Sequence, residues 1–163
     1  MGVETRHEVT VQNATERHVA VVRDRRRWAD LGPKLLPLLD RVYVAVRAGK
    51  VIQSGHNIFI FRDGSKDEVT VEVGVEVASI FQPVDGIQHA VTPGGDVAMT
   101  VHQGPYSGLG GAHEAVIRWC RAHGRPHANV WWEIYGDWHE DVAQLQTEVL
   151  YALLPAAMTP GAT

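Results

Sequence analysis

The sequence carries the same order of local patterns twice, with the second copy about 75 residues after the first. In each copy, strand patterns precede a run of apolar residues at helical spacing, and two further strand patterns follow it. This shared order predicts two similar halves that combine into one antiparallel sheet. The matching segments are residues 28–32 (WADLG) with 106–110 (YSGLG), 57–61 (NIFIF) with 131–135 (WWEIY), and 71–73 (VEV) with 147–149 (TEV).

Alternation of apolar and polar residues marks the strands. It is clearest in residues 69–77 (VTVEVGVEV), where every valine faces one side and the Thr, Glu and Gly residues face the other. Residues 7–11 and 18–22 also read as strands, and the turn-forming residues between them predict a hairpin. Helices are predicted where apolar residues recur at three- and four-residue spacing, over residues 31–46 and 109–120.

These elements predict an α+β domain made of two pseudo-symmetric βαββ-type halves. The halves are expected to form one antiparallel sheet, with two helices on one face and a ligand cleft on the other. A chain of 163 residues has room for one such domain, which we expect over residues 1–154. We place half one at about 7–82 and half two at about 86–154, and we interpret residues 155–163 as a flexible tail.

Composition and charge argue against several classes of function. The formal net charge of −4 gives no basic balance of the kind that nucleic-acid-binding domains show, so no nucleic-acid partner is expected. The single cysteine, Cys120, cannot form an internal disulfide. The chain starts without an apolar segment of signal-peptide type and has no run of about eighteen apolar residues. We therefore expect a cytoplasmic protein without a membrane partner.

Nine histidines raise the question of a metal site. His123 and His127 are four residues apart, but Gly124 and Pro126 lie between them and argue against a single helical turn. No second pair has the spacing of zinc ligands, and one cysteine cannot supply a set of thiolates. We expect neither a metal nor a cofactor.

The strand over residues 130–135 (VWWEIY) carries the chemistry. Alternation places Trp131, Glu133 and Tyr135 on one face of this strand, so a carboxylate lies between two aromatic rings. Such a group suits a cavity for planar or cationic molecules, because rings attract cations and a carboxylate neutralises a charge that is costly to bury. The alternation equally allows an exposed Glu133 that pairs with an arginine across the sheet.

The chain resembles the GyrI-like small-molecule-binding family (SHS2-type tandem fold). The resemblance rests on Gly104-Pro105-Tyr106, on Leu109-Gly110 and on residues 132–135 (WEIY), and it extends from about Val9 to Leu154. The family includes the effector-binding domains of AraC- and MerR-type multidrug regulators, together with stand-alone proteins. The resemblance implies a cleft between the halves that binds lipophilic, often cationic, aromatic compounds, with the family's cleft glutamate at Glu133. No helix-turn-helix pattern accompanies it here.

We therefore expect a stand-alone binding protein, a monomer or weak dimer, whose partners are lipophilic aromatic or cationic small molecules. Some stand-alone members of the family look like hydrolases that open strained cyclopropane rings of alkylating natural products. In that alternative, Glu133 acts as general acid or base and Tyr135 donates a hydrogen bond to the substrate. A second alternative is a protein-interaction module with exposed tryptophans. The candidate ligand-binding residues are Glu133, Tyr135, Trp131, Trp138, Tyr106 and Tyr151.

Overall fold

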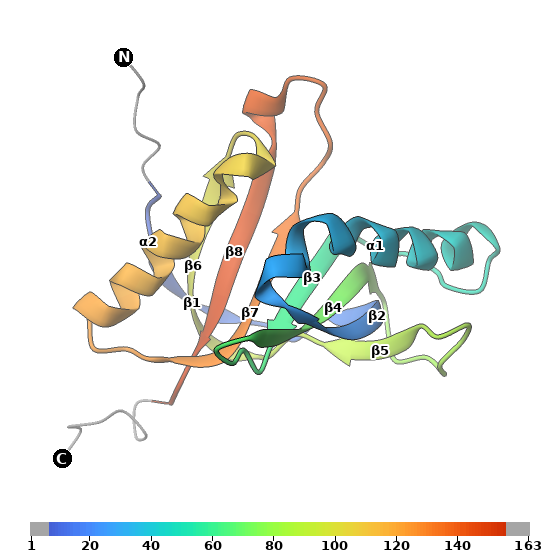
Figure 1. Ribbon diagram of the computed structural model, residues 1–163, viewed down its shortest axis with the longest axis horizontal. Coiled ribbons are helices and arrows are strands. Elements are labelled where there is room, and N and C mark those ends of the chain that lie inside the picture. Colours follow the sequence, from blue (N-terminus) through green and yellow to red (C-terminus); the bar gives the residue numbers. More distant parts are fainter. Residues whose placement is uncertain (1–6, 156–163) are drawn as a thin grey trace.

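Eight strands and two long helices make up the computed structural model, which describes residues 7–155 (Figure 1). Apart from Pro155, the tail expected over residues 155–163 lies outside the described residues. The strands are β1 Thr10–Ala14, β2 His18–Arg27, β3 Asn57–Arg62, β4 Glu68–Val77, β5 Gln88–Val91, β6 Gly95–Gln103, β7 His127–Tyr135 and β8 Gln146–Leu153. The helices are α1 Leu31–Arg47 and α2 Leu109–Ala122, each preceded by a short 3-10 turn, η1 Trp28–Asp30 and η2 Tyr106–Gly108. A third 3-10 turn, η3 Val142–Gln144, precedes β8.

The strands form one antiparallel sheet in the order β1-β6-β8-β7-β3-β4-β2-β5. Strands β3 and β7 pair at the centre of the sheet. Outward from this pair, equivalent strands follow in the same order on both sides. Strands β4, β2 and β5 follow β3, whereas β8, β6 and β1 follow β7. The α+β class, the single antiparallel sheet and the two pseudo-symmetric sets of elements are thereby confirmed.

The hairpin predicted from the first two strands is wrong. β1 pairs with β6, with Thr10 opposite Met99, while β2 lies at the other side of the sheet between β4 and β5. Each edge strand therefore joins the opposite half of the sheet. β1 lies in the first half of the sequence but completes the second half of the sheet, and β5 does the reverse. Alternation identified a strand near the N-terminus, but a local pattern carries no information about a partner almost ninety residues away.

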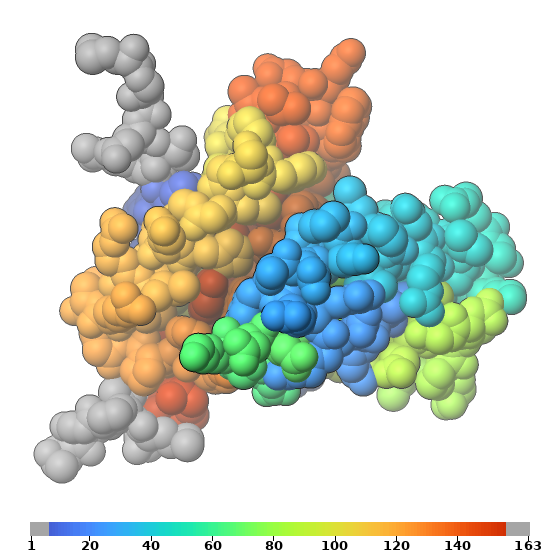
Figure 2. All heavy atoms as spheres, in the orientation of Figure 1, coloured from blue at the N-terminus to red at the C-terminus, as the bar shows by residue number. Residues whose placement is uncertain are grey.

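Both helices cover the same face of the sheet. The buried valines of β4 pack with Leu38, Leu39 and Val42 of α1, as the alternation of that strand predicts. Helix α2 places Ala112 and Val116 over β6 and β8, and it also contacts the side chains of β7. The two helical clusters share Trp131 and Tyr135 at their borders, so β7 lies between the helices. Figure 2 shows α1 (blue) and α2 (yellow to orange) as separate ridges with strand atoms visible between them.

The face without helices has a core of its own. Ile58, Ile60 and Trp132 are almost fully buried there together with residues of β2, β6 and β8. This second core explains the uninterrupted apolar run in β3, because Phe59 and Phe61 face the helices while the two isoleucines face away. No helix between residues 7 and 155 combines the length and the apolar character needed to cross a membrane.

Candidate functional site: an aromatic cavity between the two helices

Trp131, Glu133 and Tyr135 share one face of β7, as predicted, and that face is the one covered by the helices. The cleft was expected on the opposite face, and for these residues that expectation is wrong. Alternation shows which residues share a face but not whether a helix covers it. The two helices diverge over the centre of the sheet, and β7 runs between them (Figure 1).

A cavity of about 460 Å³ lies between the helices. Trp28 and Leu31 form one wall at the start of α1, and His113 and Ile117 form the opposite wall on α2. The turn that joins β3 to β4 closes one end, and the floor consists of aromatic side chains from three strands. The volume is in the range of pockets that hold small organic molecules.

The floor is a row of rings from neighbouring strands. Phe61, Trp131 and Tyr151 lie directly opposite one another on β3, β7 and β8. Trp131 is nearly parallel to both neighbours, with interplanar angles of 9° and 7° and centroid distances of 5.8 and 5.6 Å. Trp28 lies parallel to Trp131 as well, at 6.2 Å and 7°. His127 meets Trp131 and Tyr151 edge-on. The floor is therefore a stack of rings in which Trp131 lies between Phe61 and Tyr151.

A chain of hydrogen bonds runs beside this floor. The Tyr135 hydroxyl donates to Glu133 Oε1 at 2.7 Å, and His113 Nε2 lies 2.7 Å from Glu133 Oε2. His113 Nδ1 lies 2.7 Å from the Tyr151 hydroxyl. With His113 neutral and its proton on Nε2, the ring donates to Glu133 and accepts from Tyr151. Glu133 is only 6% exposed, and no arginine between residues 7 and 155 pairs with it, so the alternative of an exposed Glu133 paired across the sheet is wrong.

Tyr135 and Tyr151, the two tyrosines in this chain of hydrogen bonds, stay protonated at neutral pH. Burial raises the pKa of Tyr135 far above its ordinary value, and the Glu133 carboxylate raises it further because it accepts the hydroxyl hydrogen bond. Burial also raises the pKa of Tyr151, again with a contribution from the charge of Glu133. The tyrosines are therefore fixed hydrogen-bond donors, and the negative charge of the site belongs to Glu133.

Glu133 itself does not line the cavity. His113 and Tyr151 do, and Glu133 meets the cavity through its hydrogen bond to His113. His113 thus lies between the Glu133 carboxylate and the cavity.

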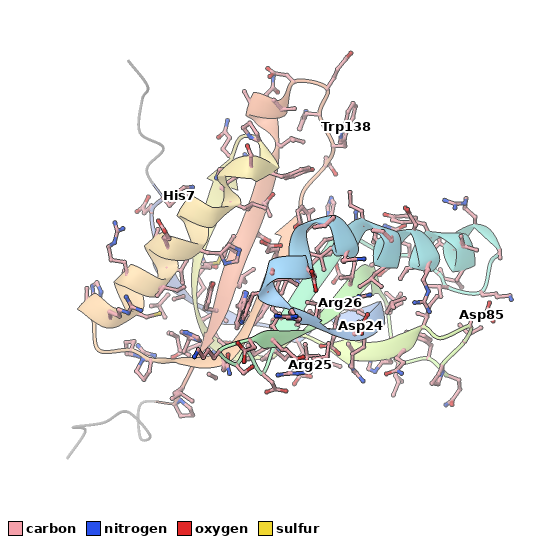
Figure 3. All side chains as sticks on the ribbon, in the orientation of Figure 1. His7, Asp24, Arg25, Arg26, Asp85 and Trp138 are labelled. Carbon is pink, nitrogen blue, oxygen red and sulfur yellow. The ribbon has the colours of Figure 1, made fainter. Side chains whose placement is uncertain are left out.

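The other predicted ring residues lie farther from the cavity. Tyr106 is 44% exposed and contacts Tyr135 edge-on, so it borders the hydrogen-bond chain rather than the cavity. Trp138 is 75% exposed in the loop between β7 and β8 (Figure 3) and is not among the cavity residues. The structure thus brings together Trp131, Glu133, Tyr135 and Tyr151, with Tyr106 at the margin and Trp138 apart.

Sequence reasoning missed several residues of the site, and His113, Phe61 and Trp28 are the most important of them. His113 falls at helical spacing with the apolar face of α2, so it read as one more buried position. A histidine on the buried face of a helix, facing a strand with a central glutamate, is the pattern that identifies it. Phe61 and Trp28 gave no comparable indication, because aromatic residues at those positions are equally typical of a core.

Comparison with solved structures places this arrangement in a known fold. The C-terminal domain of EcmrR has a TM-score of 0.71 at 18% identity, over 92% of this chain and 99% of that one. SAV2435, solved with tetraphenylphosphonium bound, has a TM-score of 0.64 at 10% identity, over 96% and 99%. A hydrolase from Listeria innocua has a TM-score of 0.59 at 9% identity, over 90% and 92%. At these identities the likeness shows a shared fold.

The sequence also matches a family model directly. No curated protein is significantly similar to the chain. The model of the GyrI-like small-molecule-binding domain, in contrast, matches residues 7–153, which include both halves, both helices and all the cavity residues. The chain therefore belongs to the GyrI-like family of small-molecule-binding domains.

Proposed function

We propose that this domain binds lipophilic aromatic cations in the cavity between α1 and α2. The observation that carries the proposal is the buried Glu133 carboxylate beside a floor of parallel rings. We place the activity in a monomer or weak dimer, since one chain supplies every wall of the cavity. We also place it in the cytoplasm, as expected from the sequence.

The rings account for the aromatic part of the ligand. Trp131 is stacked between Phe61 and Tyr151, and this row of rings gives ligands of different outlines an aromatic surface to pack against without a specific hydrogen-bond pattern. Each cation–π contact contributes about 0.5 to 2 kcal/mol, with the larger value for desolvated sites. This floor supports binding of several unrelated aromatic compounds rather than one.

Glu133 accounts for the preference for positive charge. Its two partners are His113 and Tyr135, and no arginine or lysine within residues 7–155 forms an ion pair with it. A buried carboxylate in this state attracts an organic cation whose own charge is weakly hydrated. The structural neighbour SAV2435 was solved with tetraphenylphosphonium, an aromatic cation of this class, which supports the proposal.

The test is a calorimetric titration of the protein with tetraphenylphosphonium and with a planar cation, ethidium. We expect dissociation constants in the micromolar range for both. Glu133→Gln should weaken both about tenfold or more, which corresponds to about 1.4 kcal/mol or more. Trp131→Ala should have an effect of similar size, because it removes the centre of the floor.

Two controls make this test specific. Trp138→Ala removes an exposed tryptophan outside the cavity and should leave both affinities unchanged. Triphenylphosphine oxide, a neutral aromatic compound, should bind more weakly than the cations and should not respond to Glu133→Gln. Equal loss of affinity for cation and neutral compound in Glu133→Gln would remove the charge-selective part of the proposal, and no binding by the wild type would remove all of it.

A second candidate function, a hydrolase that opens strained cyclopropane rings, is favoured by the hydrogen-bond chain. Glu133, held by Tyr135, can take a proton from water through His113, and the Tyr151 hydroxyl can donate to the oxygen that gains charge once it leaves its hydrogen bond to His113. A structural neighbour from Listeria innocua is a hydrolase. In this reading, water adds to the ring carbon, one carbon–carbon bond breaks, and the electron pair moves to the conjugated oxygen.

A further inference from the structure

A second cavity, of about 450 Å³, lies on the face of the sheet without helices. Its floor consists of buried apolar side chains, with Trp132 and Ile134 from β7 and Leu150 from β8. Its rim consists of residues 12–17, which end β1 and lead into β2, together with carboxylates from β4 and β8. None of its lining residues belongs to the cavity between the helices, so the two cavities lie on opposite faces.

The carboxylate of Glu148 is the unusual group in this cavity. It lies on β8 between Val101 of β6 and Ile134 of β7, and it is half-buried. Within residues 7–155, the Glu148 carboxylate has no hydrogen-bond or ion-pair partner, whereas its backbone is paired in the sheet. The other rim carboxylate on a strand, Glu76, receives both of its hydrogen bonds from Arg17, at 3.1 and 3.0 Å. Of these two rim carboxylates, Glu148 is the one that has apolar neighbours in the sheet and lacks a cationic partner.

The pseudo-symmetry of the fold shows what Glu148 lacks. Its counterpart on β4 is Glu72, which is 1% exposed and is held by two arginines. Arg23, directly opposite Glu72 on β2, donates to Oε2 from both Nε and Nη2, and Arg62 of β3 donates to Oε1. The first half therefore neutralises its glutamate with two guanidinium groups from the flanking strands.

Neither guanidinium group is present in the second half. Val101 stands opposite Glu148, in the position that Arg23 has opposite Glu72. Arg62 lies opposite Thr70, two residues before Glu72, and the equivalent position beside Gln146 is Gly136. The second half therefore has the glutamate, but uncharged residues stand at both positions where the first half has an arginine. Glu148 and its neighbour Ile134 both line the cavity.

We propose that this cavity binds a small organic cation with a guanidinium head and an aliphatic tail. The head pairs with Glu148 as Arg23 pairs with Glu72, and the tail lies over Trp132, Ile134 and Leu150. A guanidinium group fits because it is the group that the other half places against the equivalent carboxylate, with two N–H donors on one oxygen. The site is independent of the aromatic-cation site on the helical face.

The test is a calorimetric titration with n-hexylguanidinium. We expect saturable binding at one site in the wild type and at least a tenfold weakening in Glu148→Gln. Val101→Arg should abolish binding, because the new side chain reaches Glu148 from β6 in the way that Arg23 reaches Glu72 from β2. Val101→Gln, of similar length but without charge, should retain binding. Thermal unfolding of each variant checks that the fold is intact.

The outcomes separate this site from the helical one. Glu133→Gln should leave n-hexylguanidinium affinity unchanged, and Val101→Arg should leave tetraphenylphosphonium affinity unchanged. Three results would overturn the proposal: no binding by the wild type at millimolar ligand, equal binding by Glu148→Gln and the wild type, or loss of binding in Glu133→Gln together with competition by tetraphenylphosphonium. The last would show that the guanidinium compound enters the helical cavity instead.

Discussion

Buried carboxylates in this protein have partners of different kinds, and the difference indicates their roles. Glu72 is held by two arginines, so its charge is cancelled within the fold and its role is structural. Glu133 is held by a tyrosine and a histidine instead, without an arginine or lysine. A buried carboxylate without such a counter-ion is costly to the folded state, and in the proposed function a cationic ligand relieves that cost.

The same residue separates binding from catalysis. If the domain is a hydrolase, Glu133→Gln should lower the rate of ring opening of a cyclopropane-containing dienone by about 100-fold or more, because general acid–base catalysis contributes about 10² to 10⁴. The ring-opened phenol absorbs differently from the dienone, so the reaction can be followed spectroscopically. Tyr135→Phe should lower the rate as well, since it removes a donor that hydrogen-bonds Glu133.

The control for this prediction is Trp138→Ala, which should keep the wild-type rate. A wild-type protein that binds the dienone without accelerating its hydrolysis over buffer would rule out the hydrolase. An unchanged rate in Glu133→Gln would rule out the role of this residue. In either case, the aromatic-cation proposal stands on its own titrations.

At this scale, the sequence predicted the strand side of the site and missed the helix side. Alternation is a short-range property, so the grouping of Trp131, Glu133 and Tyr135 followed from the sequence alone. The contact between His113 and Glu133 depends on where α2 crosses β7, which no local pattern encodes. Tyr151 was a predicted ring residue without a predicted neighbour, and the register between β7 and β8 places it beside Trp131.

Among the elements, the turn between β3 and β4 determines how much room the aromatic cavity has. Trp28 of η1 donates from Nε1 to the Ser65 carbonyl at 2.8 Å, which fixes its ring parallel to Trp131. Gly64 lies beside both rings: a Cβ atom there meets Trp28 Cζ2 at 3.1 Å and Trp131 Cη2 at 3.2 Å. A glycine is required because the backbone of the turn approaches the two rings this closely. The turn, η1 and β7 therefore form one wall.

We predict that Gly64→Leu closes the cavity. The added side chain must push between two tryptophan rings, so tetraphenylphosphonium affinity should fall at least tenfold, measured by calorimetric titration. Overpacking of this kind costs about 1 to 3 kcal/mol of folding stability, which thermal unfolding will register as a modest fall in Tm. Gly110→Leu on α2 is the matched control, because a Cβ there meets nothing within 4 Å. Unchanged binding in Gly64→Leu would show that ligands do not use this part of the cavity.

The elements themselves were easier to predict than their partners. Helix periodicity and strand alternation located both helices and the long strands, because burial of one face imposes a period on the sequence. The exchange of β1 and β5 was missed, since two short strands separated by a turn are equally compatible with a hairpin. The face of the cleft was missed for a related reason, because the positions of the two helices over the sheet depend on packing between distant elements.

At the scale of the whole molecule, the exchanged edge strands hold the two halves together. β1 leaves the N-terminal end to complete the second half, and β5 returns to complete the first. A pair of histidines fastens each edge. His7 Nε2 lies 2.9 Å from His102 Nδ1 beside β6, and His18 Nδ1 lies 2.8 Å from His89 Nε2 between β2 and β5. Each pair can hold one shared proton without repulsion, but not two.

Acid should therefore loosen both edges. Burial lowers the pKa of His7 and of His89 below the ordinary value of 6.5, and the histidine opposite each of them lowers it further. The unfolded chain, whose histidines keep their ordinary pKa, then binds more protons than the folded chain. The free energy of unfolding consequently falls as the pH drops below about 6.5, and it is highest above that value. Burial lowers the pKa of His127 as well, so this residue adds to the trend.

Thermal unfolding between pH 8 and pH 5 checks this prediction. The wild type should lose Tm steadily below about pH 6.5, whereas the double variant His7→Asn/His89→Asn should lose less over the same interval, because neither edge then carries two titrating rings. Asparagine can keep a hydrogen bond to the remaining histidine, so Tm at pH 8 should change little. His139→Asn, in an exposed loop, is the control and should follow the wild type throughout. An identical pH dependence in the wild type and the double variant would mean that the edge histidines do not couple protonation to folding, and His127 would then be the residue to replace.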